Sequence, residues 1–180
     1  MVKKIFKTGL IFLLAQCLLF ACQEPVGKVL EPKQVNSYFL YEYLNHAWGY
    51  SHGGIIINPA GEIYSFDKTT PWIFATNNLL SLKEINSNIS ASIKKDTLIH
   101  SADIAKYQQL AYVAMNGKMS EPTMRGADMG AILCKILVPE TGSANTFREI
   151  ILSQNGDIEF HNLTPEAAQI SDWLKSFHLP

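Results

Sequence analysis

The stretch Gly53-Gly54-Ile55-Ile56-Ile57, followed by Asn58-Pro59-Ala60-Gly61 and Glu62-Ile63-Tyr64-Ser65-Phe66, decides the fold of this chain. Two runs rich in β-branched and aromatic residues flank a turn that contains proline and glycine, a pattern that predicts a β-hairpin. The first run is apolar at successive positions, so both of its faces should be buried. We therefore expect it to be a central strand of its sheet.

Further strands are predicted on both sides of this hairpin. The aromatic residues of 38–44 favour a strand, although Val35, Phe39 and Tyr43 also have helical spacing. Residues 131–138 and 147–152 have strand-like composition, and Asn155-Gly156 predicts a tight turn into a strand at 157–161.

Three segments have the apolar spacing of helices: residues 79–93, residues 101–116, and a C-terminal segment that begins with Thr164 as N-cap and Pro165 as the first helical residue. The predicted strands and helices do not alternate regularly. The sequence therefore predicts an α+β fold, with a mainly antiparallel sheet of about five strands packed with two to three helices.

The first 22 residues have the organisation of an export signal. Lys3, Lys4 and Lys7 precede a mostly apolar run at 9–20, which is shorter than the roughly 20 residues of a membrane-spanning helix. The run ends in Leu19-Phe20-Ala21-Cys22, which resembles the lipobox of bacterial lipoproteins. That resemblance implies cleavage before Cys22 and attachment of acyl chains such as palmitate to its sulfur.

These expectations give three parts: a signal peptide at 1–21, the lipidated Cys22 with a tether at 22–34, and one globular domain at 35–180. Anchoring to the membrane would come from the lipid on Cys22. Gln23 is not the aspartate that is associated with inner-membrane retention in this class, which favours the outer membrane. In a bacterium with a single membrane, the same residues would anchor the chain there.

Composition limits the possible partners. The full chain has 180 residues and a net charge of −1, and the expected signal would remove three lysines and no acidic residue. The remaining domain would be mildly acidic and would lack the basic surface of a nucleic-acid-binding protein. Its only thiol would be Cys134, since Cys17 leaves with the signal and Cys22 is acylated.

Cys134 and His52 form the one candidate catalytic pair. A histidine at a strand start followed by a cysteine is similar to the circularly permuted papain-like hydrolases, and this resemblance implies Cys134 as nucleophile and His52 as base. Those enzymes place the cysteine at a helix N-terminus, whereas Cys134 lies in an apolar strand and should share a face with Ile132, Ile136 and Val138. We therefore favour a core role for Cys134.

The histidines give no indication of a metal site, and the sequence gives none of a cofactor. They are not spaced like zinc ligands, so we expect no metal site and read all five histidines as solvated or capping residues. No phosphate-binding or dinucleotide-binding glycine pattern is present.

Aromatic residues are concentrated between residues 38 and 72, and we favour a sheet-core role for most of them. The candidate binding surface among them is Trp48, Tyr50 and Trp72. The sequence thus predicts a lipid-anchored, non-enzymatic binding or accessory domain of the cell envelope. Its partner would be an envelope protein or a glycan, and an envelope hydrolase using Cys134 and His52 is the alternative.

Overall fold

The computed structural model describes residues 35–47 and 49–177. The predicted signal, Cys22, the tether and Trp48 lie outside these residues. The described elements follow the order β1 (Tyr38–Asn45), β2 (Ser51–Ile57), β3 (Glu62–Phe66), β4 (Leu79–Ser81), α2 (Leu82–Ala91), β5 (Ile93–Leu98), α3 (Ser101–Ala114), β6 (Thr123–Met124), β7 (Ala131–Pro139), β8 (Thr146–Gly156), β9 (Ile158–His161) and α4 (Pro165–Ser176).

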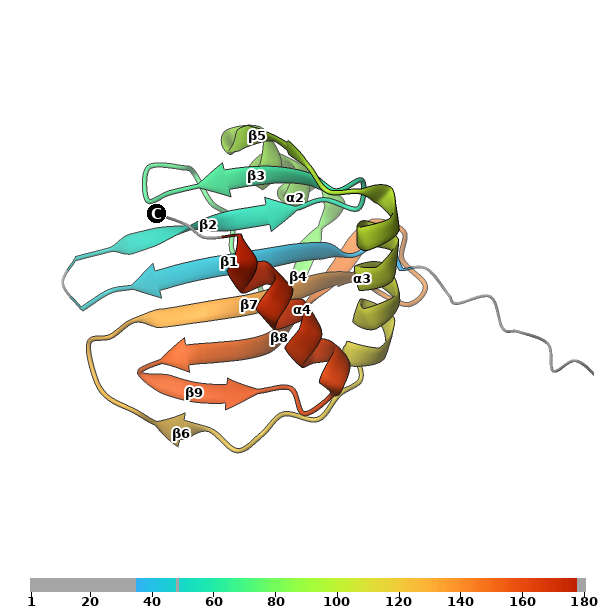
Figure 1. The fold of residues 1–180 in the computed structure, drawn as a ribbon. Helices are drawn as coiled ribbons and strands as arrows, with labels where there is room; N and C mark the ends of the chain where they lie inside the picture. Colours follow the sequence, from blue (N-terminus) through green and yellow to red (C-terminus); the bar gives the residue numbers. More distant parts are fainter. Residues whose placement is uncertain (1–34, 48, 178–180) are drawn as a thin grey trace, which may run out of the picture. The chain divides into compact units, whose positions relative to one another are not determined.

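The strands form one antiparallel sheet in the order β5-β3-β2-β1-β7-β8-β9-β6, with the short β4 paired to β8 (Figure 1). The predicted α+β class with an antiparallel sheet is confirmed. The predicted number of about five strands is too low, since the described residues contain nine. The hairpin predicted over residues 53–66 is β2–β3, and β2 is a central strand as expected, because it pairs with both β1 and β3.

One face of the sheet is covered by α3 and α4 (Figure 1). The Trp173 ring of α4 packs edge-on against Phe39 of β1 and stacks on Tyr107 of α3, with ring centroids 5.2 and 3.8 Å apart. Cys134 and Ile136 of β7 are fully buried beneath these helices. Thr164 caps α4 as predicted, because its hydroxyl accepts a hydrogen bond from the Ala167 N–H.

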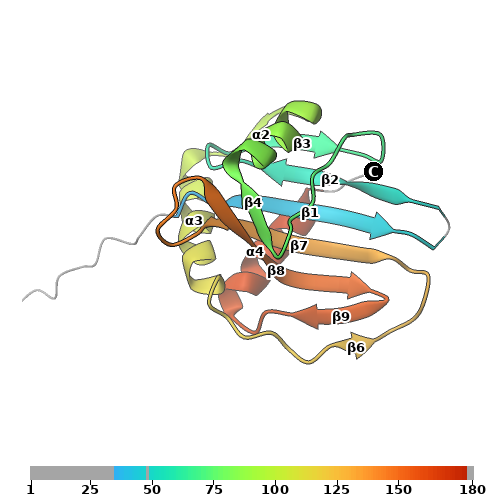
Figure 2. The same cartoon turned by 180° about the vertical axis from the view of Figure 1, so that it is seen from behind.

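The opposite face is covered by α2 and the segment that leads into β4 (Figure 2). The buried side chains here include Leu40, Ile56, Ile85 and Phe147. The helix predicted at 79–93 forms only over 82–91, since Ser81 is its N-cap in a reciprocal capping box with Glu84. In the described part of the chain, no helix combines the length and apolarity needed to cross a membrane.

Candidate functional site

Four charged or titratable side chains lie together on the sheet face that α2 covers. His52 Nε2 lies 2.7 Å from Glu42 Oε1, and Lys135 Nζ lies 2.6 Å from Glu42 Oε2 and 3.3 Å from Glu149 Oε2. The side chains of His52 and Glu42 are each 1% exposed, and that of Lys135 is 9% exposed. We refer to these four residues as the buried charge network.

The strand register explains why these residues meet. The four residues come from four adjacent strands, β2, β1, β7 and β8. Glu42 lies opposite Gly54 on one side and Leu133 on the other, so His52 and Lys135 are its diagonal neighbours on the same face. Diagonal neighbours lie within reach of long side chains, and the network therefore runs across the centre of the sheet.

Electrostatics keep the central pair ionised. Burial by itself would raise the pKa of Glu42, but the hydrogen bond from His52 and the adjacent Lys135 charge outweigh this effect and lower it. Burial would likewise lower the pKa of Lys135, but the charges of Glu42 and Glu149 raise it. An ionised carboxylate only accepts hydrogen bonds, so the proton between His52 and Glu42 resides on His52 Nε2.

Aromatic rings surround the buried imidazole ring of His52. The ring centroids of Phe66 and Phe74 each lie 5.0 Å from that of His52, Trp72 lies 5.6 Å away and Tyr50 lies 6.1 Å away. We call Tyr50, Phe66, Trp72 and Phe74 the aromatic collar. The buried Phe66 stacks on the partly buried Trp72 at 3.9 Å, while Tyr50 and Phe74 are 47% and 44% exposed.

The collar is held in place from both sides. Gly54 makes room for Phe66, because a Cβ at this position would lie 2.7 Å from the tip of the Phe66 ring. The buried Asn88 side chain of α2 accepts a hydrogen bond from the Ile73 N–H and donates one to the Ile73 carbonyl. Because Ile73 lies between Trp72 and Phe74, this double hydrogen bond fixes the backbone that carries both rings.

The structure does not bring Cys134 and His52 together. Cys134 pairs with Tyr41 across the strands and points towards α4, where its Sγ lies 3.7 Å from the Ser171 carbonyl oxygen. His52 points to the opposite face with Glu42, so the two side chains form no catalytic pair. Cys134 is fully buried, and this burial raises the pKa of its thiol. The predicted face shared with Ile136 and Val138 is confirmed.

The reading of all five histidines as solvated or capping residues is wrong for His52. This side chain is buried because its ring packs among the aromatic collar and its Nε2 finds a carboxylate inside the sheet. Within the described ranges, no cluster of three or more His, Cys, Asp or Glu side chains has the arrangement of a metal site. Of the predicted binding surface, Tyr50 and Trp72 meet around His52, and Trp48 lies outside the described residues.

Most residues of the site are not predicted from the sequence. Glu42, Lys135, Glu149 and Phe74 were not expected to take part, although two of them carry a usable signal. Glu42 is a single charge in an aromatic run, and Lys135 is a single charge in the apolar run 131–138. An isolated charge in a buried strand requires a partner, but the sequence does not give the strand register that would identify it.

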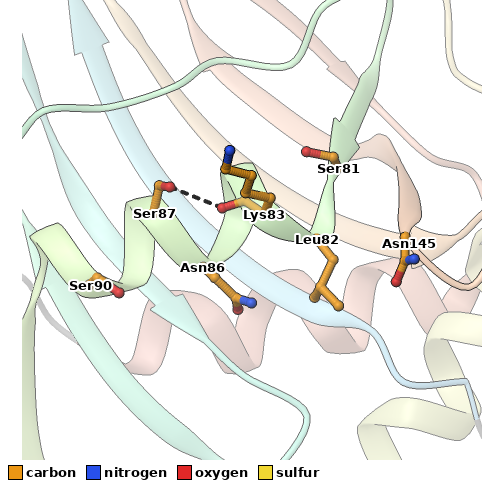
Figure 3. A pocket seen from close by; sticks show the side chains of 7 residues that line it. All are labelled: Ser81, Leu82, Lys83, Asn86, Ser87, Ser90 and Asn145. Carbon is orange, nitrogen blue, oxygen red and sulfur yellow. Dashed lines mark hydrogen bonds between the residues drawn. The ribbon is translucent and has the colours of Figure 1, made fainter.

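A second hollow lies along α2 and has a different character (Figure 3). It is lined by Ser81, Leu82, Lys83, Asn86, Ser87, Ser90 and Asn145. The Ser81 hydroxyl caps α2, and the Ser87 hydroxyl donates to the Lys83 carbonyl of the preceding turn. These hydroxyls serve the helix itself, and the hollow contains no aromatic ring, so we place the candidate site at the collar instead.

The arrangement is suited to binding rather than to proton transfer. The His52 and Glu42 side chains are buried beneath the collar. A general base must come within hydrogen-bond distance of the proton that it abstracts, so neither side chain is placed to act as one. The exposed rings of Tyr50 and Phe74 are the part of the site that a partner can contact.

Comparison with known proteins identifies no relative: no family model, no curated protein and no solved structure matches this chain.

Proposed function

We propose that this chain is a lipid-anchored cell-envelope protein whose globular domain binds an envelope component through the aromatic collar and does not act as an enzyme. The observation that carries the proposal is the collar itself: two half-exposed rings packed around the buried His52, which is paired with the buried Glu42. Rigid aromatic side chains are the residues that most often supply binding energy at protein surfaces, because they bury a large area at little entropic cost.

The buried charge network supports this function by fixing the collar. Burying several charges often stabilises a fold no more than apolar packing of the same volume does, so we assign the network an orienting role. Here the network orients the His52 ring, against which Phe66, Trp72 and Phe74 pack. A surface whose rings are already ordered loses less entropy when a partner binds.

The lipid anchor is supported by the basic start, the apolar run at 9–20 and the Ala21-Cys22 junction. Stable anchoring requires more than one acyl chain, which a fully modified lipoprotein cysteine carries. The absence of aspartate at position 23 favours the outer membrane. Growth with an alkyne-tagged palmitate should label the wild-type chain and leave a Cys22→Ser variant unlabelled, whereas equal labelling of both chains would refute the anchor.

The collar is tested by retention of the full chain, purified in detergent, on isolated and washed cell envelopes. The double variant Tyr50→Ala/Phe74→Ala should lose most of this retention. Tyr112→Ala is the matched control, because Tyr112 lies on α3 away from the collar and is 41% exposed. Equal retention of the collar variant and the control would refute the collar as the binding surface.

A further inference from the structure

A hollow of about 530 Å³, distinct from the one along α2, opens on the sheet face that α4 covers, beside the aromatic collar but on the other side of the sheet. Its wall includes Tyr41 and Tyr43 of β1, Gly53 of β2, Ser65 and Asp67 at the end of β3, and Lys95 of β5. His52, Gly54 and Phe66 also border it, although strand alternation directs the His52 and Phe66 side chains to the collar face. Its volume falls within the roughly 300–1,000 Å³ of small-molecule sites.

The hollow exists because a side chain is missing from one row of the sheet. Tyr43 lies opposite Ile132 of β7 on one side and Gly53 of β2 on the other. Because glycine has no side chain, the third position of this cross-strand row is empty. The neighbouring rows contain Tyr41 with Cys134, and Phe39 with Ile136. α4 packs over Phe39 and Cys134, and the residues that line the hollow lie further along the sheet, towards the end of β1 and the start of β2.

The two sides of the hollow differ in chemistry. Tyr41, Tyr43 and Ile132 give one side an apolar surface, and the Tyr43 hydroxyl is held in place by a hydrogen bond from Asn45 Nδ2 at 3.0 Å. The other side carries the Ser51 and Ser65 hydroxyls, the Asp67 carboxylate and the Lys95 ammonium group. Asp67 is fixed by hydrogen bonds from the Thr69 N–H and hydroxyl, at 2.8 and 2.6 Å.

These features select a class of ligand. One carboxylate and one ammonium group balance each other, so neither an anion nor a cation is favoured overall. A wholly apolar ligand would displace water from the polar side without replacing its hydrogen bonds, which lowers affinity. A molecule with an apolar face for the tyrosine rings and hydroxyls for the opposite wall satisfies both sides.

We propose that this hollow is a binding site for an uncharged saccharide, with the sugar ring over Tyr41 and Tyr43 and its hydroxyls on Ser65, Asp67 and Lys95. The proposal rests on the proposed binding function and names one ligand class for it. The collar, on the other face of the same end of the sheet, remains available to a separate part of the envelope component.

Gly53 provides a direct test. A Cβ at Gly53 would have Phe66 O at 3.3 Å and Asp67 Cα at 3.7 Å as its nearest neighbours, a fit that a small adjustment accommodates. Gly53→Val adds a β-branched residue, which is favourable in a strand, and directs its methyl groups into the hollow. Tyr43→Ala removes the apolar side without adding bulk, and Tyr112→Ala again serves as the distant tyrosine control.

The experiment is calorimetric titration of the full chain in detergent with chitotetraose, cellotetraose and maltotetraose, with folding of each variant checked by near-ultraviolet circular dichroism. We expect saturable binding of at least one of the three, weakened about tenfold or more by Gly53→Val and by Tyr43→Ala, which corresponds to about 1.4 kcal/mol or more. Tyr112→Ala should leave the affinity unchanged.

Two results would overturn the saccharide site: no binding of any of the three oligosaccharides, or unchanged binding by folded Gly53→Val and Tyr43→Ala chains. Either result leaves the collar proposal standing if Tyr50→Ala/Phe74→Ala still abolishes retention on envelopes. Conversely, saccharide binding that depends on Gly53, together with unaltered retention of the collar variant, would refute the collar and keep the saccharide site.

Discussion

Replacing Lys135 with methionine should reveal how strongly the fold depends on the buried charge network. The methionine side chain fills a similar volume but removes the ammonium group that lies 2.6 Å from Glu42 Oε2 and 3.3 Å from Glu149 Oε2. The hydrogen bond from His52 to the other Glu42 oxygen remains. Glu42 would then be a buried carboxylate that has lost its cationic partner.

The expected cost follows from the burial of the pair. Removing one partner of a buried ion pair destabilises proteins by about 3–5 kcal/mol, because the remaining charge is left without compensation. Lys135 and Glu42 are 9% and 1% exposed, so solvent screens this loss little. We therefore expect Lys135→Met to lower the free energy of unfolding by about 3–5 kcal/mol at neutral pH.

The assay is urea unfolding of the full chain in detergent, followed by far-ultraviolet circular dichroism. Lys94→Met is the matched control, because the ion pair of Lys94 with Glu62 lies at the surface, with Lys94 58% exposed. Exposed pairs are screened and contribute little, so this control should unfold like the wild type. A loss for Lys135→Met of less than about 1 kcal/mol, the range of a surface pair, would refute the role of Lys135 in compensating buried charge.

Three further variants test Glu42, Gly54 and Cys134. The folded-state pKa of Glu42 lies below its ordinary value of 4.5, so its stabilising contribution is present above pH 4.5 and is lost as the pH falls through the folded pKa. Glu42→Gln should therefore flatten the acid side of a curve of stability against pH. An unchanged acid side would contradict the direction of the pKa shift. Gly54→Ala should destabilise the folded domain by more than about 3 kcal/mol, since its Cβ would lie 2.1 Å from the Tyr41 carbonyl oxygen. Gly53→Ala is the control and should unfold near the wild-type temperature. Similar melting temperatures for the two variants would show that the register at Gly54 is wrong. Cys134→Ser should cost about 1–3 kcal/mol in thermal unfolding, because it places a hydroxyl, which is more strongly hydrated than a thiol, at a fully buried position. A variant as stable as the wild type would show that the burial of this hydroxyl carries no cost.

The main strands and helices could be predicted because their signals are local. The β2–β3 hairpin is marked by its turn residues, β2 by its unbroken apolar run, and α4 by Thr164 and Pro165. The strands that were missed lack such signals. All six residues of β5 are exposed and include two lysines, a composition that suits a protected edge strand but has no apolar periodicity. The short strands β4 and β6 exist only through their partners β8 and β9.

The site could be predicted only in part, because strand register is not encoded locally. Tyr50 and Trp72 were expected at a binding surface from their aromatic character and position, and the structure places both beside His52. The partnership of Glu42 with His52 and Lys135 depends on which residues of β1, β2 and β7 lie diagonally across from one another. A shift of one residue would place Glu42 on the opposite face, so no sequence pattern could have identified its partners.

The central claim, that the collar is a binding surface, is tested most directly by photo-crosslinking in living cells. A benzophenone amino acid incorporated in place of Phe74, which is 44% exposed in the collar, should yield an adduct of defined mass after irradiation. The same amino acid in place of Tyr112, which is 41% exposed on α3, should yield none. No adduct from position 74, or the same adduct from both positions, would contradict the claim.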